Sequence, residues 1–512
     1  MSTTAIPGHT QNSARPVQGP SKQAIAGLTG IFVAAMMAGL NARVGSIGLP
    51  DIRGALGSSL DDTSWLTTAY TVGELIATPF ASWFAITLSV RRFHLSMVGL
   101  CALIAAVLPF IQDLNLLIGL RFVQGMSSGA LIPILMMAAL KFLPPNIRLH
   151  GLALYAMTAT FAPNLAIWLT GQWTDGLSDW RWIYWQIIPL CALAAILVGW
   201  GLPREEINFG RFREGNWLGM GCGVTALALL AIALDQGVRL DWLNSPIITV
   251  TLVAGLVLLG IYLLTEWFHK APFLRPQLLG RRNLGVGSLI FTSLLVVLMS
   301  GALLPSTYLG ALQDYRPFQT SPIGLLIAIP QLVLGSIVAL FLYKKWVDAR
   351  VILALGLFLI ALACFSGAQL TSEWHRDQFF STQLLQALGQ PMAVVSILFL
   401  MTSVVEPSEG PYFAGTINTL RVLGSLIGGA FVGQLLTVRS RFHTEMLLDH
   451  AAFVGNSIPQ PPDPSALIGI IAQQSMVLSV ADAYRVLGSL SLLLIPLALR
   501  MAYVPAPDVK KP

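Results

Sequence analysis

Residues 120–130 read LRFVQGMSSGA and lie inside an apolar run that extends from 116 to 140. A run of about 20 apolar residues is long enough to cross a bilayer as a helix. Its polar and small residues recur at intervals of three and four, as Arg121, Gln124, Gly125, Ser128 and Gly129. A helix places residues with this spacing on one face. Because small residues let a neighbouring helix approach and polar ones need a wet or paired surface, the stretch predicts a membrane span with a functional face.

The whole chain has the composition of a membrane protein. Of its 512 residues, 55% are hydrophobic and 11% are charged, and the mean hydropathy is +0.71. Soluble proteins are roughly 25% charged, so this chain has too little polar surface to cover a globule in water. Its net charge of +6 is no sign of nucleic-acid binding, because basic residues in membrane proteins mark the cytoplasmic side. We therefore expect the lipid bilayer as a partner and no nucleic acid.

Hydrophobic windows bounded by charges, Pro, Gly and Trp predict fourteen spans. They are 25–47, 65–88, 94–111, 116–140, 151–171, 182–202, 216–235, 246–268, 284–310, 322–343, 351–371, 379–403, 411–436 and 478–500. An even number puts both termini on one side. If that side is the cytoplasm, eighteen Lys and Arg lie in cytoplasmic segments and seven in outer ones, and the other five lie within predicted spans. The excess of basic residues predicts a multi-pass membrane protein with both termini in the cytoplasm.

We single out four of the charged residues within the predicted spans, because charge in a membrane is costly and by default marks a functional site. They are Arg43, Glu74, Arg121 and Arg421. At about 1.5 Å per residue, the first three fall at similar depths, so they can meet in one cavity in the outer half of the membrane. Three plainer interpretations remain open. The charges form an inert ion pair, Arg43 extends to the headgroups, or Arg421 only binds backbone carbonyls.

Four stretches together are similar to a known transporter family. LRFVQGMSSGA resembles the fourth-helix RxxQG motif of the major facilitator superfamily. The stretches FLPPNIRLHG (142–151), WRWIYWQIIP (180–189) and NTLRVLGSLIGG (418–429) resemble its fourteen-helix drug:proton antiporter branch, the EmrB/QacA type. The resemblance implies an all-α integral membrane protein of the major facilitator fold, with two six-helix bundles and an inserted helix pair.

On that fold the chain divides into bundles and connecting segments. The expected domains are a cytoplasmic tail 1–24, an N-terminal six-helix bundle 25–202, a cytoplasmic linker 203–215, an inserted helix pair 216–268, a C-terminal six-helix bundle 284–500 and a cytoplasmic tail 501–512. The second bundle contains a long outer loop at 437–477, which is Pro-rich at 459–464 and amphipathic before it. We interpret this loop as solvated, and the alternatives are a cover for the outer mouth or a contact with a partner.

The chain departs from the family pattern where family members carry acidic residues. The first-helix motif resembling LDxTxxNVALP reads LNARVGSIGLP here, with Asn41 at the Asp position and Arg43 at the Thr position. The loop after the second span keeps Arg91 and Arg92 but has Ile86 in place of the acidic residue. The carboxylate that attracts cations in the first helix is therefore gone.

Three Arg against one Glu give the predicted cavity a positive charge, which favours anions in a low-dielectric setting. We therefore predict an anionic or zwitterionic amphiphile as the substrate. The competing view is that Arg43 and Glu74 neutralise each other and that the apolar lining sets a broad drug specificity. The residues assigned to proton coupling are Glu74 and Arg121, and those assigned to substrate binding are Asn41, Arg43, Gln124, Asn164 and Arg421.

For coupling, we expect Glu74 to carry the proton. Burial disfavours the charged carboxylate whereas nearby Arg favours it, so a change of access or a substrate arriving at Arg43 or Arg121 can change its protonation. The predicted function is proton-driven export of small amphiphilic compounds or drugs across the inner membrane by rocking of two bundles. No cofactor is expected besides the proton. By family resemblance, such exporters often join a periplasmic HlyD-type adaptor and an outer-membrane TolC-type channel.

Three other classes of function, a symporter, an enzyme and a channel, find different degrees of support in the sequence. A symporter that imports organic acids with protons is the first alternative. A membrane-embedded enzyme would need an HExxH, a GxSxG or a cluster of His and carboxylates at one depth. The sequence predicts that all seven His lie outside the spans, counting His94, the first residue of the span 94–111, as a boundary residue. A channel finds little support, because no selectivity-filter loop or ring-forming acidic repeat is present. We therefore predict a transporter rather than an enzyme.

Overall fold

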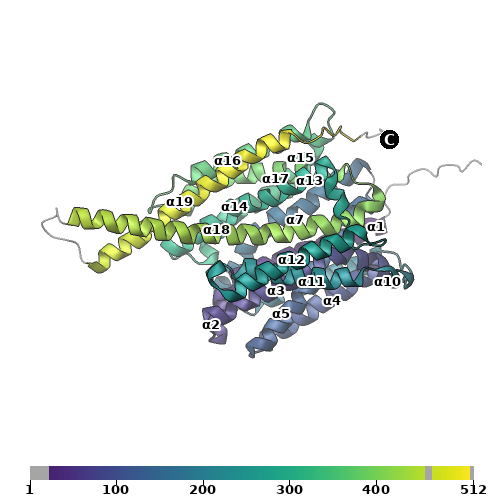
Figure 1. Cartoon of the computed structure of the whole chain (residues 1–512), viewed down its shortest axis with the longest axis horizontal. Coiled ribbons are helices and arrows are strands. Elements are labelled where there is room, and N and C mark those ends of the chain that lie inside the picture. Colours follow the sequence, from purple (N-terminus) through teal and green to yellow (C-terminus); the bar gives the residue numbers. More distant parts are fainter. Residues whose placement is uncertain (1–21, 144, 456–463, 508–512) are drawn as a thin grey trace, which may run out of the picture.

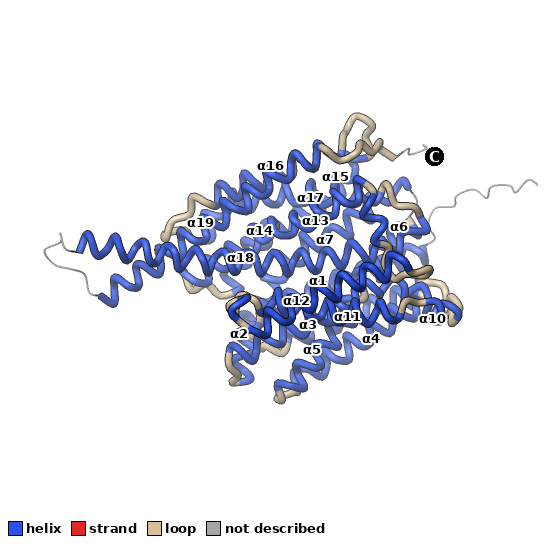
Figure 2. The backbone as a smooth tube through the Cα atoms, viewed as in Figure 1, coloured by secondary structure: helices blue, strands red, loops and turns tan. Residues whose placement is uncertain are grey.

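The protein is an elongated bundle of helices in the computed structural model (Figures 1 and 2). The structure describes residues 22–143, 145–455 and 464–507, and every regular element in these ranges is helical. Fourteen helical segments are long and apolar enough to cross a membrane. The predicted fold class, all-α with fourteen membrane spans, is confirmed.

The first six spans form the N-terminal bundle. They are α1 (Lys22–Ile47), α3 (Leu60–Leu88), α4 (Val90–Val107), α5 (Leu114–Gly129) with α6 (Leu131–Phe142), α7 (Pro145–Gly171), and α8 (Trp182–Trp185) with α9 (Ile187–Gly201). Short helices lie in the connections between them, namely α2 (Leu49–Leu56), η1 (Leu108–Phe110) and η2 (Gln172–Gly176).

Two further spans follow a linker. The linker contains the short α10 (Gly210–Glu214), and the inserted pair consists of α11 (Trp217–Gln236) and α12 (Pro246–Phe268), joined by η3 (Trp242–Asn244). The last six spans form the C-terminal bundle. Its elements are η4 (Pro276–Gly280), α13 (Arg282–Val297) with α14 (Met299–Leu312), α15 (Pro317–Leu342), α16 (Ala349–Gly367), η5 (Arg376–Phe379), α17 (Phe380–Thr402), η6 (Pro407–Glu409), α18 (Gly410–Gly455) and α19 (Pro464–Leu499).

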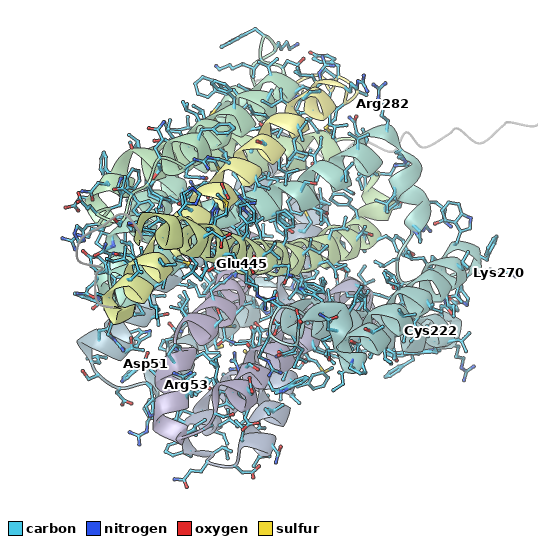
Figure 3. The ribbon with its side chains drawn as sticks, turned by 60° about the vertical axis from the view of Figure 1, so that its left-hand side comes forward. Asp51, Arg53, Cys222, Lys270, Arg282 and Glu445 are labelled. Carbon is cyan, nitrogen blue, oxygen red and sulfur yellow. The ribbon has the colours of Figure 1, made fainter. Side chains whose placement is uncertain are left out.

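The two ends of the bundle differ in shape. Helix α1 begins and α19 ends at one end, which we call the termini end (Figure 1). The other end carries the projecting parts of α18 and α19, and we call it the hairpin end. In Figure 3, Asp51 and Arg53 of α2 lie at the hairpin end, whereas Lys270 and Arg282 lie at the termini end.

The projecting hairpin differs from the loop that the sequence predicts at 437–477. Most of this segment is helical, because α18 continues to Gly455 and α19 begins at Pro464 (Figure 2). The Pro-rich part at 459–464 lies almost entirely outside the described residues. Polar side chains that suggest a loop are satisfied between the two helices: Asp482 Oδ2 of α19 lies 2.6 Å from Arg439 Nε and 2.8 Å from His443 Nε2, both on α18.

The prediction that all histidines lie outside the spans is wrong. His94 lies in α4 and is fully buried, and His443 lies in α18.

Helix α4 begins earlier than the sequence suggests. The charge of Arg91 indicates a loop in the sequence, but Arg91 Nη1 donates to the carbonyl oxygen of Leu202 at 3.0 Å. A basic side chain at a helix end satisfies terminal carbonyls in this way.

Helices α3 and α5 touch through their backbones, as the small-residue stripe predicts. A Cβ atom on Gly125 would lie 2.0 Å from the carbonyl oxygen of Tyr70, and one on Gly129 would lie 2.5 Å from that of Glu74. Only glycine permits so close an approach. The stripe of the RxxQG motif therefore fixes the segment of α3 that carries Glu74.

The two bundles are packed together at the termini end. The Tyr155 hydroxyl of α7 donates to Asn418 Oδ1 of α18 at 2.9 Å. A Cβ atom on Gly415 of α18 would lie 2.8 Å from the carbonyl oxygen of Pro79 on α3. These contacts close the space between the bundles on this side.

The inserted pair contacts both bundles at the hairpin end. Thr68 Oγ1 of α3 donates to Asp235 Oδ2 of α11 at 2.5 Å. Trp242 Nε1 in η3 donates to Gln434 Oε1 of α18 at 2.9 Å. Helix α11 therefore lies beside the junction of α3 and α18 and forms part of the wall between the bundles.

Candidate transport site

A cavity of about 680 Å³ lies between the two bundles. Residues from α1, α3, α5, α7, α11, α13, α14, α17 and α18 line it. Ser46, Ile47 and Leu436 bring its lining close to the hairpin end, whereas the contacts of Tyr155 and Gly415 lie on its closed side. The cavity therefore occupies the half of the bundle that faces the hairpin end.

Glu74 and Arg421 form an ion pair in the cavity wall. Arg421 Nη2 lies 3.2 Å from Glu74 Oε1, and the exposed fractions of the two side chains are 11% and 13%. Glu74 belongs to α3 of the N-terminal bundle and Arg421 to α18 of the C-terminal bundle. The pair thus joins the two bundles, and the interpretation that Arg421 binds only backbone carbonyls is wrong.

Arg43 lines the same cavity from α1 but has no such partner. Its guanidinium forms neither a hydrogen bond nor an ion pair with any residue that the structure describes. Because Glu74 is bound to Arg421, the cavity presents Arg43 as a cation that is not neutralised by direct contact.

Arg121 belongs to the cavity lining but is almost completely buried among aromatic and amide groups. It is 2% exposed, and its Nη1 donates to Gln124 Oε1 at 2.7 Å. Its Cζ atom lies 4.4 Å from the ring centre of Tyr70 and 5.6 Å from that of Tyr184. Such cation–π contacts stabilise a buried guanidinium. Arg121 therefore fixes the α3–α5 contact and does not pair with Glu74.

The three predicted amide residues have different positions. Asn164 lines the cavity; its Nδ2 donates to the Thr160 carbonyl at 2.6 Å, and its Oδ1 has no hydrogen-bond partner among the described residues. Asn41 and Gln124 are buried behind the lining. Asn41 Nδ2 donates at 3.3 Å to the Tyr70 hydroxyl, which itself donates to Ser128 Oγ at 2.7 Å.

The structure therefore brings together most of the residues that the sequence singles out. Arg43, Glu74 and Arg121 line one cavity, as the depth argument expects, and Asn164 and Arg421 line it as well. Their roles in coupling and binding stay predictions. Asn41 and Gln124 do not reach the cavity, because Tyr70 and Arg121 lie between them and it.

Sequence reasoning missed two carboxylates of the inserted pair, of which Asp235 is half-buried and Glu266 is buried. Asp235 of α11 lines the cavity, but it falls at the end of an apolar run and reads as a span boundary. Glu266 of α12 is completely buried and accepts hydrogen bonds from Asn216 Nδ2 and from the backbone N–H groups of Phe273 and Leu274. Glu266 could have been identified from the sequence, because it is an acidic residue inside the predicted span 246–268.

A second polar link joins the bundles at the hairpin end, outside the spans. Arg316, which precedes α15, donates from Nη2 to Asp51 Oδ1 of α2 and from Nε to Asp175 Oδ1 of η2, both at 2.6 Å. These hydrogen bonds raise the pKa of Arg316 above its usual value. Asp175 also accepts from the Phe318 N–H at 2.9 Å. The N-terminal turns α2 and η2 are thus tied to the start of α15.

Two curated relatives are similar to most of the chain. The Multidrug export protein EmrB of Escherichia coli (strain K12) is 26% identical over 459 residues, which is 87% of this chain and 86% of that protein. The Fatty acid resistance protein FarB of Neisseria gonorrhoeae is 25% identical over 426 residues, which is 82% of each chain. The resemblance to the EmrB type that the sequence motifs indicate is confirmed.

A solved structure and a family model complete the comparison. The crystal structure of the human organic anion transporter MFSD10 (TETRAN) matches 93% of this chain and 100% of its own chain, with a TM-score of 0.57 and 14% identity. At this identity the match shows the fold alone, and it agrees with the predicted helix arrangement. The model of the Major Facilitator Superfamily matches residues 31–315. Because that match spans more than half of a chain whose fold and motifs agree with it, this protein belongs to the Major Facilitator Superfamily.

Proposed function

We propose that this protein is a proton-coupled exporter of small amphiphilic compounds. The observation that carries the proposal is the ion pair between Glu74 and Arg421, which joins the two bundles at the wall of a cavity. Relatives named for multidrug export and fatty acid resistance support the direction of transport. Fatty acids are anionic amphiphiles, so the second name agrees with a substrate that carries a negative charge.

Glu74 is the proton carrier in this proposal. A proton on the carboxylate removes its charge and with it the attraction to Arg421. The link between α3 and α18 then weakens, so proton binding changes the relative stability of arrangements in which these helices are together or apart. A ligand that favours one of two arrangements shifts their populations, and this is the coupling that rocking bundles need.

Arg43 is the residue that we propose to receive the negative group of the substrate. Its guanidinium is not neutralised by direct contact, and it lies in the same cavity as the Glu74–Arg421 pair. A guanidinium binds a carboxylate through two parallel hydrogen bonds. The substrate is therefore an anionic or zwitterionic amphiphile, whose apolar part packs on lining residues such as Leu298, Met299 and Val422.

Proton flux in inside-out vesicles tests this proposal. A pH gradient, acid inside, is set up, and aromatic carboxylates, zwitterions and lipophilic cations are added in turn. Compounds with a negative group should collapse the gradient in the wild type and fail to do so in Glu74→Gln. Flux with lipophilic cations alone would contradict the proposed substrate class, and an undiminished rate in Glu74→Gln would contradict the proposed carrier.

The same experiment separates export from the alternative of uptake. An antiporter exchanges an external substrate for an internal proton, so the gradient collapses on addition. A symporter of organic acids moves the proton together with the acid, so acid added outside draws no protons out. Absence of collapse together with acid efflux driven by the gradient would favour the symporter.

We also propose the inner membrane, with the termini end in the cytoplasm, as the location. The hairpin of α18 and α19 then projects into the periplasm, where a HlyD-type adaptor would meet it. The adaptor and a TolC-type channel stay predictions from the family resemblance. Cross-linking from Glu445, which lies on the projecting part of α18 (Figure 3), tests whether a periplasmic protein binds there.

A further inference from the structure

Asp235 is the second carboxylate of the cavity and differs from Glu74 in its partners. Its Oδ2 accepts a hydrogen bond from Thr68 Oγ1 at 2.5 Å. No cationic group in the described part of the chain forms an ion pair with it. Arg239, which lies in the turn after α11, binds Gln236 Oε1 at 2.6 Å and Asp61 Oδ1 at 2.8 Å instead. Asp235 therefore presents a carboxylate that is bound by one hydroxyl and no cation.

The charged groups around Asp235 are occupied with one another. On α3, Glu74 binds Arg421 of α18, and Asp61 binds Arg239 in the turn after α11. Arg121 of α5 is 2% exposed and bound to Gln124. Two charged groups of the lining thus remain without a partner of opposite charge and in reach of a ligand, the cation Arg43 on α1 and the anion Asp235 on α11.

We propose that Arg43 and Asp235 are the two poles of a substrate site for a zwitterionic amphiphile. Asp235 binds the ammonium group and Arg43 binds the carboxylate, both through charge-assisted hydrogen bonds. Leu234 of α11 and Val238, which follows the end of that helix, also line the cavity, and their apolar side chains contact the apolar part of the substrate. This assignment rests on the proposed function and narrows its substrate class.

The two poles also account for exchange of substrate against a proton. A carboxylate binds either an ammonium group or a proton, so a substrate ammonium at Asp235 displaces a proton from it. An anion at Arg43 alone acts in the opposite sense, because neutralising a cation makes nearby carboxylates hold protons more readily. An anion alone therefore does not compete with a proton for one group, and its exchange against a proton depends on the change of arrangement at the Glu74–Arg421 pair. The ammonium group of a zwitterion, bound at Asp235, adds the direct competition with a proton that favours antiport.

Binding of three matched compounds to the purified protein tests the two poles. The first is an aryl amino acid with its ammonium and carboxylate at opposite ends, and the other two each have one charged group replaced by methyl. The wild type should bind the zwitterion about tenfold more tightly than either of the others. Asp235→Asn should lose this advantage over the acid, and Arg43→Gln should lose it over the amine.

Two further variants separate recognition from folding. Asp235→Glu keeps the charge and should keep the preference for the zwitterion. Asp61→Asn changes another carboxylate, which is 73% exposed on the same side of the bundle and absent from the cavity lining, and should leave all three affinities unchanged. Equal weakening of all three compounds by Asp235→Asn, no effect of it, or no binding of the zwitterion by the wild type would each overturn the assignment.

Vesicle flux with the same compounds distinguishes failure of this assignment from failure of the proposed function. Wild-type proton flux that is independent of Asp235 would leave the exporter proposal standing and contradict the two-pole site. Binding that depends on both Arg43 and Asp235, in a wild type that shows no proton flux, would support the two-pole site and contradict the exporter proposal.

Discussion

Glu74 on α3 and Arg421 on α18 are 347 residues apart in the sequence and 3.2 Å apart between Oε1 and Nη2. Their side chains are only 11% and 13% exposed, so each charge depends on the other for solvation. Removing one member of such a pair leaves an uncompensated charge in a poorly hydrated place. The pair is therefore both a structural tie between the bundles and a place where a single proton has a large effect.

A double-mutant cycle measures the strength of this tie. Arg421→Gln leaves the Glu74 carboxylate without its cation and should lower the free energy of unfolding by about 1–3 kcal/mol. The double variant Glu74→Gln with Arg421→Gln should recover part of this loss, because two amides can share a hydrogen bond. Unfolding is followed in detergent for all four proteins. Strictly additive effects would show that the two side chains do not interact.

The contact between α3 and α5 requires glycine at position 125. The methyl group of Gly125→Ala would lie 2.0 Å from the carbonyl oxygen of Tyr70, so the helices must move apart, and the melting temperature and yield of folded protein should fall. Gly119→Ala on the same helix is the matched control, since a Cβ there meets no atom within 4 Å. Equal melting temperatures for the two variants would contradict the close approach.

The bridge formed by Arg316 is expected to hold the hairpin end together. An exposed ion pair contributes about 0.5–1 kcal/mol, so Arg316→Gln should raise access to the cavity roughly two- to fivefold. The measurement is the labelling rate of Thr71→Cys, a lining position, by a hydrophilic maleimide in a Cys222→Ser background. Arg53→Gln, a change in α2 close to Asp51, is the control (Figure 3). Equal rates in the two variants would argue against a closing role for Arg316.

Glu266 is expected to stabilise the inserted pair without acting in transport. It accepts hydrogen bonds from the Phe273 and Leu274 N–H groups and from Asn216 Nδ2, and it does not line the cavity. Glu266→Ala should lower the free energy of unfolding, since each buried donor left unpaired costs about 1–3 kcal/mol. The variant protein that does fold should transport at the wild-type rate. A selective loss of proton flux in folded protein would give Glu266 a role that its position does not suggest.

The fold could be predicted from the sequence because apolar runs of bilayer length report directly on membrane spans. The helix boundaries predicted from the sequence are wrong at two places, and at each of them a charged side chain has a partner within the structure. Arg91 donates to a helix end, so α4 begins before the first residue of its predicted span. Asp482 binds Arg439 and His443, so a segment with the composition of a loop forms two helices.

Most residues of the site could be identified from the sequence, but the ion pairs between them could not. A charge inside an apolar run identifies Arg43, Glu74 and Arg421 one at a time. Which of the arginines meets Glu74 depends on how α18 packs beside α3, and no local pattern reports this. Asp235 was missed because an acid at the end of a run is indistinguishable, in sequence, from the boundary of a span.

Transport by purified Glu74→Gln protein in proteoliposomes tests the central claim most directly. A variant that cannot change its charge should lose accumulation of substrate driven by a pH gradient but retain substrate exchange at equal pH on both sides, because exchange needs the cavity and no proton. Loss of accumulation with exchange retained is the predicted result. Accumulation at the wild-type level would contradict the assignment of Glu74 as the proton carrier.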